Sequence, residues 1–210
     1  MSKEMNTIAV LTSGGDAPGM NAAIRSVVRT ASDYGIKEVG IDRGFEGLLH
    51  GDIMELGERD VSGIMNRGGT ELHTARSAEM RTPEGVEKAA KLCGILQLDA
   101  LVIIGGNGSL AGGLDLSKHG VNIMGIPGTI DLDLDCTEYT IGFDTAVNTS
   151  LDCVNKIRDT SCSHERCSIV EVMGRDAGFI ALWTGLTGGA EEVLVPEDPV
   201  DRDAIVEQIL

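Results

Sequence analysis

Short, β-branched apolar runs alternate along the chain with longer segments in which apolar residues recur at helical spacing. Nearly continuous apolar runs are typical of parallel strands that are buried on both faces. The runs predict strands at Thr7–Leu11, Lys37–Ile41, Ala100–Ile104, Asn122–Ile126, Cys167–Met173 and Glu192–Val195. The other segments predict helices at Gly19–Tyr34, Pro83–Leu96, Ser109–His119, Thr145–Thr160 and Ala177–Leu186. This alternation predicts an α/β fold with a parallel sheet.

The composition narrows the classes of partner. The chain has 210 residues, 42% of them hydrophobic, and a formal net charge of −16. It is long enough to bury a sizeable core. Its acidity argues against nucleic acid or a membrane surface as a general partner, because a polyanion would be repelled at long range. Any anionic ligand must therefore be held by local cationic groups.

Three features of the sequence predict a cytoplasmic protein. The cysteines at positions 93, 136, 153, 162 and 167 form no CxxC pair and no Cys/His metal spacing, which is typical of reduced thiols. The first 15 residues lack the pattern of a secretion signal. The longest uncharged stretch, Ala100–Leu114, is too short to cross a bilayer.

Two glycine-rich turns follow predicted strands, at Gly14–Asn21 and Gly105–Ser109, and each leads into a predicted helix. Glycines allow close backbone approach, and the free N–H groups at a helix start attract phosphate. An ordinary strand-to-helix turn would use the same residues. However, ligands of parallel sheets bind beyond the carboxyl ends of the strands, so two such turns can converge on one polyphosphate. Neither turn has the GxxxxGK[ST] spacing of a P-loop.

A third predicted strand is followed by three acids, Asp131, Asp133 and Asp135, at alternate positions. If this segment is extended, the three carboxylates point the same way. Such a group suits metal coordination, or one carboxylate can act as a base toward a hydroxyl. A solvated acidic loop is the alternative interpretation.

Arginines near the predicted turns are the candidate phosphate clamps. Arg76, Arg166 and Arg175 follow glycine turns or stand beside predicted strands, and Arg25 and Arg29 share one face of the first helix. Any one of them alone could equally be a solvated surface arginine. The four histidines show no triad or metal spacing, and the sole tryptophan, Trp183, is expected in the core.

Taken together and in this order, these segments resemble the 6-phosphofructokinase family. The matching pieces are GGDAPGMNAAIR, NRGGT…AR, GG-x-GS, PGTID-x-D, YTIGFDTA, RDTS-x-SH-x-R, VEVMGR and GG-x-E-x-VLVPE. The resemblance implies the parallel-sheet, Rossmann-like phosphofructokinase fold, with a nucleotide-binding α/β domain over residues 1–140. Residues 141–210 would be the start of the substrate-binding α/β domain, which is incomplete because the family's chain runs about half as long again.

The resemblance implies transfer of the γ-phosphoryl group of ATP to the 1-hydroxyl of fructose 6-phosphate, a step of glycolysis, with Mg²⁺ as cofactor. Asp131 would be the base, with Thr129, Asp133 and Arg175 beside it in the catalytic set. The residues implied at the nucleotide are Gly14, Arg76, Gly106, Asn107, Gly108, Ser109 and Gly112, and those at the sugar phosphate are Thr129, Asp131, Asp133, Arg166, Met173, Gly174 and Arg175. Small residues at Gly108 and Gly128 resemble the ATP-dependent branch of the family.

The resemblance also implies assembly and regulation. Arg166 would reach the substrate bound to a neighbouring subunit, which implies a homo-oligomer, a tetramer in the family. A nucleotide or another phosphorylated effector would bind between subunits, at Arg25, Arg29, Arg158 and the stretch from Gly189 to Glu191.

Three residues depart from the family pattern. Asn107 stands where the family has the aspartate that holds Mg²⁺, and a neutral amide keeps an oxygen ligand but loses the charge. Leu132 replaces an asparagine of the catalytic loop, and Cys136 replaces a glycine. We therefore expect a phosphofructokinase whose catalysis is impaired. The alternative is a non-catalytic nucleotide-binding or regulatory relative.

Overall fold

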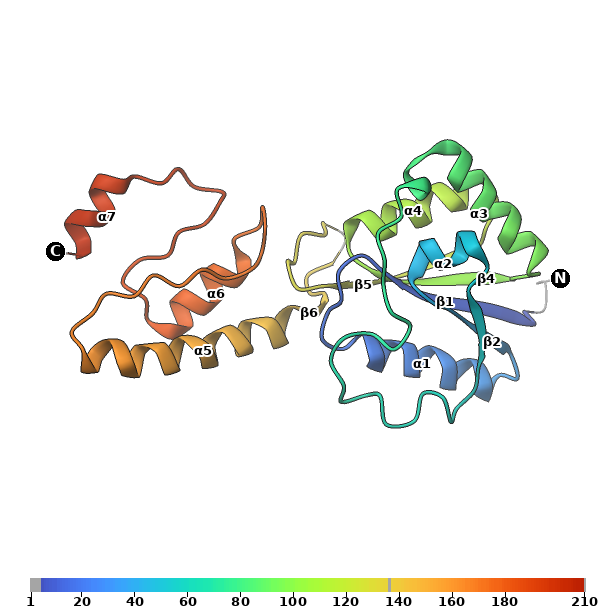
Figure 1. Cartoon of the computed structure of the whole chain (residues 1–210), viewed down its shortest axis with the longest axis horizontal. Helices are drawn as coiled ribbons and strands as arrows, with labels where there is room; N and C mark the ends of the chain where they lie inside the picture. The colour runs from blue at the N-terminus through green and yellow to red at the C-terminus, as the bar shows by residue number, and fades with distance from the viewer. Residues whose placement is uncertain (1–4, 136, 210) are drawn as a thin grey trace. The chain divides into compact units, whose positions relative to one another are not determined.

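A computed structural model describes residues 5–135 and 137–209, which form two compact units (Figure 1). Of the described residues, those up to Thr129 form the first unit and those from Ile130 onward form the second. The boundary between the compact units precedes position 140, where the sequence predicts that the functional domains divide. Cys136 lies outside the described residues.

The first unit is built on five strands in the order β3-β2-β1-β4-β5. Parallel pairing joins β1 to β2, β1 to β4 and β4 to β5, and β3 pairs antiparallel with β2 at the edge. Because β1, β4 and β5 are parallel, their carboxyl ends lie at one edge of the sheet. The strands are β1 (Thr7–Ser13), β2 (Lys37–Ile41), β3 (Ile53–Leu56), β4 (Ala100–Gly105) and β5 (Ile123–Thr129).

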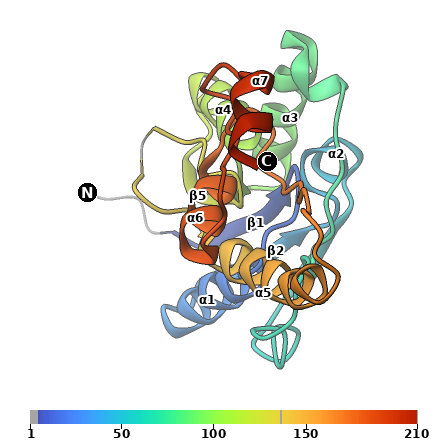
Figure 2. The ribbon, with the colours of Figure 1, turned by 90° about the vertical axis from the view of Figure 1, so that its left-hand side faces the viewer.

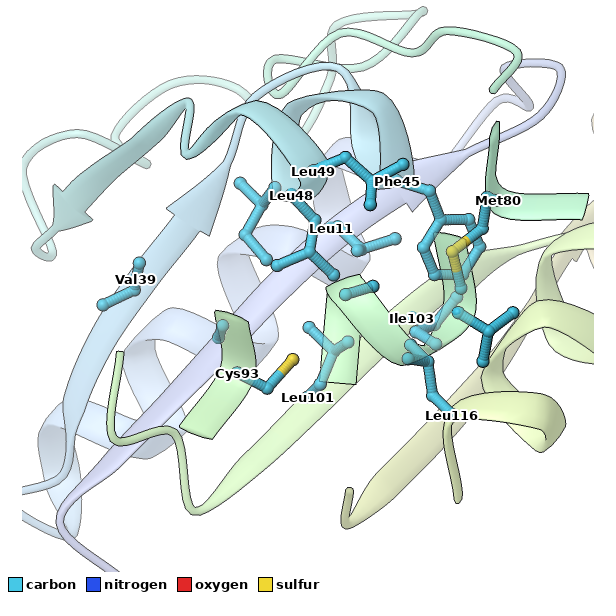
Figure 3. Close-up of a cluster of buried hydrophobic side chains, with 14 residues drawn as sticks. Leu11, Val39, Phe45, Leu48, Leu49, Met80, Cys93, Leu101, Ile103 and Leu116 are labelled. Atoms are coloured by element: carbon cyan, nitrogen blue, oxygen red, sulfur yellow. The ribbon is translucent and has the colours of Figure 1, made fainter. Parts of the chain in front are cut away.

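Helices cover both faces of this sheet. Figures 1 and 2 both place α1 on one side and α2, α3 and α4 on the other. The buried side chains under α2 and α3 form a continuous cluster that includes Leu11, Phe45, Leu101 and Ile103 (Figure 3). The helices are α1 (Met20–Asp33), α2 (Gly44–His50), α3 (Pro83–Ile95) and α4 (Asn107–Lys118), with a 3₁₀ turn at Glu79–Arg81.

Local sequence explains where α3 begins. The Thr82 hydroxyl oxygen accepts a hydrogen bond of 3.1 Å from the Gly85 amide, which satisfies one of the free donors of the first turn. Pro83 follows at the first helical position, where its missing N–H costs nothing, and Glu84 faces the positive end of the helix dipole.

The second unit contains the short strand β6 (Ile141–Gly142) and three helices, α5 (Phe143–Ser163), α6 (Phe179–Gly188) and α7 (Arg202–Ile209). Among the described residues, no helix is long and apolar enough to cross a membrane.

The structure confirms the four strands predicted in the first unit and all five predicted helices. Two predicted strands, Cys167–Met173 and Glu192–Val195, are wrong, because neither segment is a strand in the structure. A strand needs a neighbour that takes up its backbone hydrogen bonds. No strand pairs with either segment within the described residues, and Ile169 is 91% exposed.

Trp183 is also not a core residue, since it is 48% exposed on α6. The α6 sequence is apolar nearly all round, but its buried residues are Ile180, Thr184 and Gly188. The apolar run therefore predicts the helix correctly, but the expectation that Trp183 lies in the core is wrong.

Candidate functional site

Two glycine loops meet at the edge of the sheet where β1 and β4 end. The Ser109 hydroxyl, which is buried, donates a hydrogen bond of 2.8 Å to the Ser13 carbonyl oxygen at the end of β1. A Cβ added at Gly14, where φ is +88°, would lie 3.2 Å from the Ser109 Oγ. A Cβ added at Gly105 would lie 2.6 Å from the Ser13 carbonyl oxygen. Glycine is therefore required at both positions for the β1 loop to contact the start of α4.

Both helices that follow these loops present open amino-terminal ends. Gly19 and Gly106 are the N-cap residues of α1 and α4, and within the described chain neither helix start has a side-chain cap or an acid in its first turn. The first N–H groups of a helix have no partner inside the helix, and its dipole places partial positive charge there. The two helix starts lie beyond neighbouring parallel strands, and such an arrangement favours a bound anion, typically phosphate.

A third segment, residues 66–76, is tied to the same edge by Asn21. This buried side chain of α1 donates a 3.0 Å hydrogen bond to the Arg67 carbonyl oxygen and accepts a 2.7 Å hydrogen bond from the Glu71 amide. The motif that contains Asn21 was visible in the sequence, but its pairing with a segment 46 to 50 residues away was not.

Threonines complete this attachment. The Thr12 hydroxyl lies 2.8 Å from the Thr70 hydroxyl and donates to the His73 carbonyl oxygen, and the Thr74 hydroxyl donates to the Gly14 carbonyl oxygen at 2.5 Å. The segment is thus joined to the β1 loop itself. Arg76 follows two residues later and is exposed.

The remaining predicted nucleotide residues divide into two kinds. A Cβ added at Gly112 would lie 3.0 Å from the Phe45 ring, so this glycine is explained by the packing of α4 against α2. A Cβ added at Gly108 would meet nothing within 4 Å, so Gly108 faces open space beside the helix start. Gly106 lies close to Thr129 at the end of β5, because a Cβ added there would be 3.5 Å from the Thr129 Cβ.

In the second unit the structure brings together Asp131, Asp133 and Arg175. The Arg175 guanidinium lies 3.5 Å from Asp133 Oδ2. Burial raises the pKa of Asp131, the neighbouring charge of Asp133 raises it further, and Arg175 opposes both effects. The other oxygen of Asp133, Oδ1, is buried and has no hydrogen-bond partner among the described residues. A carboxyl group with a raised pKa, next to a cation, suits proton transfer with a hydroxyl group.

Unusual backbone geometry builds this cluster. Leu132 has φ +57°, a left-handed conformation, so the segment that carries the three aspartates is not an extended strand. Gly174 has φ +144°, and a Cβ there would lie 2.4 Å from the Ala177 carbonyl oxygen. Arg175 follows with φ +53°, in the tight turn before α6.

The strain at Leu132 is testable because Leu134 offers a matched control in the same loop. Leucine disfavours the left-handed conformation by roughly 1 kcal/mol, whereas asparagine tolerates it. We expect Leu132→Asn to leave the second unit about 1 kcal/mol more stable than Leu134→Asn does, because only residue 132 has a positive φ. Urea unfolding followed by the fluorescence of Trp183, the chain's sole tryptophan, reports on this unit. Equal losses for the two variants would show that position 132 carries no strain.

The other predicted residues of the second unit are less closely grouped. Arg166 and Met173 are exposed. The Arg166 backbone amide donates to the Ser161 carbonyl oxygen at the end of α5. The guanidinium of Arg158 lies 3.7 and 3.9 Å from Cβ positions built on Gly188 and Gly189. Arg158 thus lies at the carboxyl end of α6, where a cation is favourable.

The remaining predicted effector residues occupy different places. On α1, Arg25 donates a hydrogen bond of 2.9 Å to the Val61 carbonyl oxygen, and Arg29 is exposed. Glu191 in the second unit is exposed. The Arg25 guanidinium therefore makes a hydrogen bond within its own unit.

The described part of the chain contains neither a disulfide nor a cluster of side chains suited to hold a metal ion. Cys93, Cys153, Cys162 and Cys167 are free, and burial raises the pKa of the Cys93 thiol to about 11, which makes it unreactive. No group of three or more His, Cys, Asp or Glu side chains that could hold a metal occurs among residues 5–135 and 137–209.

Comparisons with known proteins point to one family. Residues 7–210 match the family model described as phosphofructokinase. The chain is 59% identical to the ATP-dependent 6-phosphofructokinase of Clostridium botulinum and 60% identical to that of Clostridium tetani, over 98% of its own length and 65% of theirs. Among solved structures, phosphofructokinase from Saccharomyces cerevisiae matches 97% of the chain with a TM-score of 0.88 and 36% identity, over 31% of that chain.

Proposed function

Because the chain belongs to the phosphofructokinase family, we propose that it carries the nucleotide site and part of the sugar site of an ATP-dependent 6-phosphofructokinase. The product would be fructose 1,6-bisphosphate. The observation that supports this most is the contact of the β1 loop with the start of α4, with two helix starts open to an anion. The chain spans 65% of the length of its curated relatives, so the activity is proposed for the protein of which these residues are part.

In this proposal each set of residues has its own chemical role. The loop amides at Gly14 and from Gly106 to Gly108 hold the polyphosphate of ATP, and Arg76 adds positive charge. Ser109 supports this loop, because its amide donates to the Gly106 carbonyl oxygen and its hydroxyl donates to the Ser13 carbonyl oxygen. The sugar 1-hydroxyl oxygen attacks the γ-phosphorus, its proton passes to Asp131, and the bond from the γ-phosphorus to the bridging oxygen breaks to release ADP. Arg175 and Asp133 orient this base, and Thr129, Arg166, Met173 and Gly174 contact the sugar phosphate.

The Mg²⁺ that the family implies does not fit the residues at the start of α4. The four positions from Gly106 to Ser109 provide an amide, a buried hydroxyl and backbone groups, but no carboxylate. Mg²⁺ prefers charged oxygen ligands and gives up its water reluctantly. Asn107 is therefore a poor replacement for an acidic ligand, and we propose that catalysis is impaired relative to the family for this reason.

Assembly, regulation and location follow the family in this proposal. The protein forms a homo-oligomer in which Arg166 reaches a neighbouring subunit. A nucleotide or another phosphorylated effector binds at Arg25, Arg29, Arg158 and residues 189–191. The cytoplasm, the site of glycolysis, is the proposed location.

The variant Gly108→Asp tests the nucleotide site. The position has open space for a side chain, and an acid near the start of a helix stabilises it by about 0.3–1 kcal/mol. The same carboxylate would repel and obstruct the phosphates. We expect unchanged or higher thermal stability, together with a loss of ATP affinity of about tenfold or more in calorimetric titration.

Ser117→Asp is the matched control, because it adds the same charge near the other end of α4. It should leave ATP affinity within about twofold of the parent chain, since charges so far apart are screened. Equal ATP affinity in the parent chain and in Gly108→Asp would overturn the placement of the nucleotide.

A further inference from the structure

The two helix starts that would face a polyphosphate attract it with uncharged groups. Within the described residues, neither α1 nor α4 has an acid in its first turn or a side-chain cap. Asn107 is the first residue of α4 and is exposed. The attraction therefore comes from backbone N–H groups and from the partial positive charge at each helix start. This attraction grows with the negative charge of the ligand.

The side chains around these helix starts provide weak ligands for a divalent cation. The hydroxyl of Ser109 is buried and donates to Ser13, so it does not face a ligand. The β1 loop provides one carboxylate, that of Asp16, which is exposed. A single exposed carboxylate holds Mg²⁺ weakly, because the ion keeps most of its water unless several oxygen ligands replace it.

Free ATP carries two more negative charges than its magnesium complex. Both of these charges raise the affinity of a site made of helix dipoles and the nearby Arg76. At a site with an aspartate at position 107, the same charges would lower the affinity and a bound metal ion would raise it. Resting on the proposed nucleotide site, we propose that this chain binds uncomplexed ATP in preference to magnesium-bound ATP. Asn107 sets this preference, so the nucleotide site is one for metal-free polyphosphate.

The preference has a definite size and reverses with one substitution. Two charges at the helix starts correspond to about threefold or more in affinity. The parent chain should therefore bind ATP about threefold or more tightly in EDTA than in excess Mg²⁺. In Asn107→Asp, the affinity in EDTA should fall by a similar factor, and Mg²⁺ should then strengthen binding rather than weaken it.

The experiment is a calorimetric titration of the 210-residue chain with ATP, in EDTA and in excess MgCl₂, at equal ionic strength. The variants are Asn107→Asp and, as the chemically identical control, Asn122→Asp, which is exposed just before β5. Asn122→Asp should keep the preference of the parent chain for EDTA. A change of the same size in both variants would show that total charge, and not position 107, sets the preference, and would overturn the proposal.

Two further outcomes separate this proposal from the one on which it rests. ATP binding that requires Mg²⁺ in the parent chain would overturn the preference for free ATP and leave the nucleotide site standing. ATP binding in neither buffer would overturn the nucleotide site itself, and the preference with it.

Discussion

Replacing Glu38 by glutamine is expected to stabilise the first unit more at pH 8 than at pH 4.5. The effect on the free energy of unfolding differs between the two pH values by at most about 3 kcal/mol. Glu38 is 4% exposed on β2, and neither of its carboxylate oxygens has a hydrogen-bond partner within the described residues. Burial raises its pKa from an ordinary value of 4.5 to about 7. Because Val39 and Ile41 face the core cluster under α2, Glu38 points to the opposite, α1 side of the sheet.

The direction of the pH dependence follows from proton binding. Between pH 4.5 and 7, the folded chain keeps a proton on Glu38 that the unfolded chain has lost, so stability falls as the pH rises through this window. Above pH 7 the full cost of the buried charge remains. Glutamine carries no charge, so the variant loses this slope.

Hydrogen exchange of the β1 and β4 amides, measured from pH 4.5 to pH 8, gives the stability of the first unit. The control is Glu55→Gln on the adjacent strand β3, where the carboxylate is exposed and paired with Lys37. Its pH dependence should match that of the parent chain. If Glu38→Gln and the parent chain keep the same slope, then Glu38 is not buried as a neutral acid.

Replacing Gly44 by alanine is expected to destabilise the first unit by about 3 kcal/mol. Gly44 begins α2 with φ +61°, and a Cβ there would lie 2.5 Å from the Thr12 carbonyl oxygen. A side chain at this position would be strained by its backbone angle and would also press on the end of β1. Because Thr12 holds residues 70 and 73, the change should also loosen the segment that carries Arg76.

Gly51, at the other end of α2, separates the two contributions. Its φ is +75°, but a Cβ there would meet nothing within 4 Å. Gly51→Ala should therefore show the backbone strain alone, about 1 kcal/mol. Hydrogen exchange of β1 reads both variants. A loss in Gly44→Ala no larger than that in Gly51→Ala would show that α2 does not approach β1 as closely as described.

The parallel core of the fold could be predicted from the sequence because its strands are buried on both faces. Runs such as Ala100–Ile104 are apolar for that reason, and the glycines after them mark the turns into helices. The sequence does not predict β3, because this strand is only four residues long and its residues are largely exposed. Residues 167–173 show the opposite failure, since an apolar run is a strand only where a partner strand pairs with it.

The candidate site could be predicted in its residue types but not in its geometry. The sequence indicates aspartates and an arginine as candidates, and the structure shows that Asp131, Asp133 and Arg175 interact with one another. The left-handed turn at Leu132 was not visible, because leucine is an unfavourable residue for it. The role of Asn21 was also not visible, since it depends on hydrogen bonds to residues far along the chain.

In the proposed nucleotide site, the β1 loop and the start of α4 bind the phosphates of ATP. Amide chemical-shift mapping of the ¹⁵N-labelled chain during titration with ATP tests it most directly. The largest shifts should occur at Gly14, Gly15 and residues 106–108, and they should saturate together with a single affinity. If the chemical shifts of these amides stay unchanged while those of other amides change and saturate, this placement of the phosphates is contradicted.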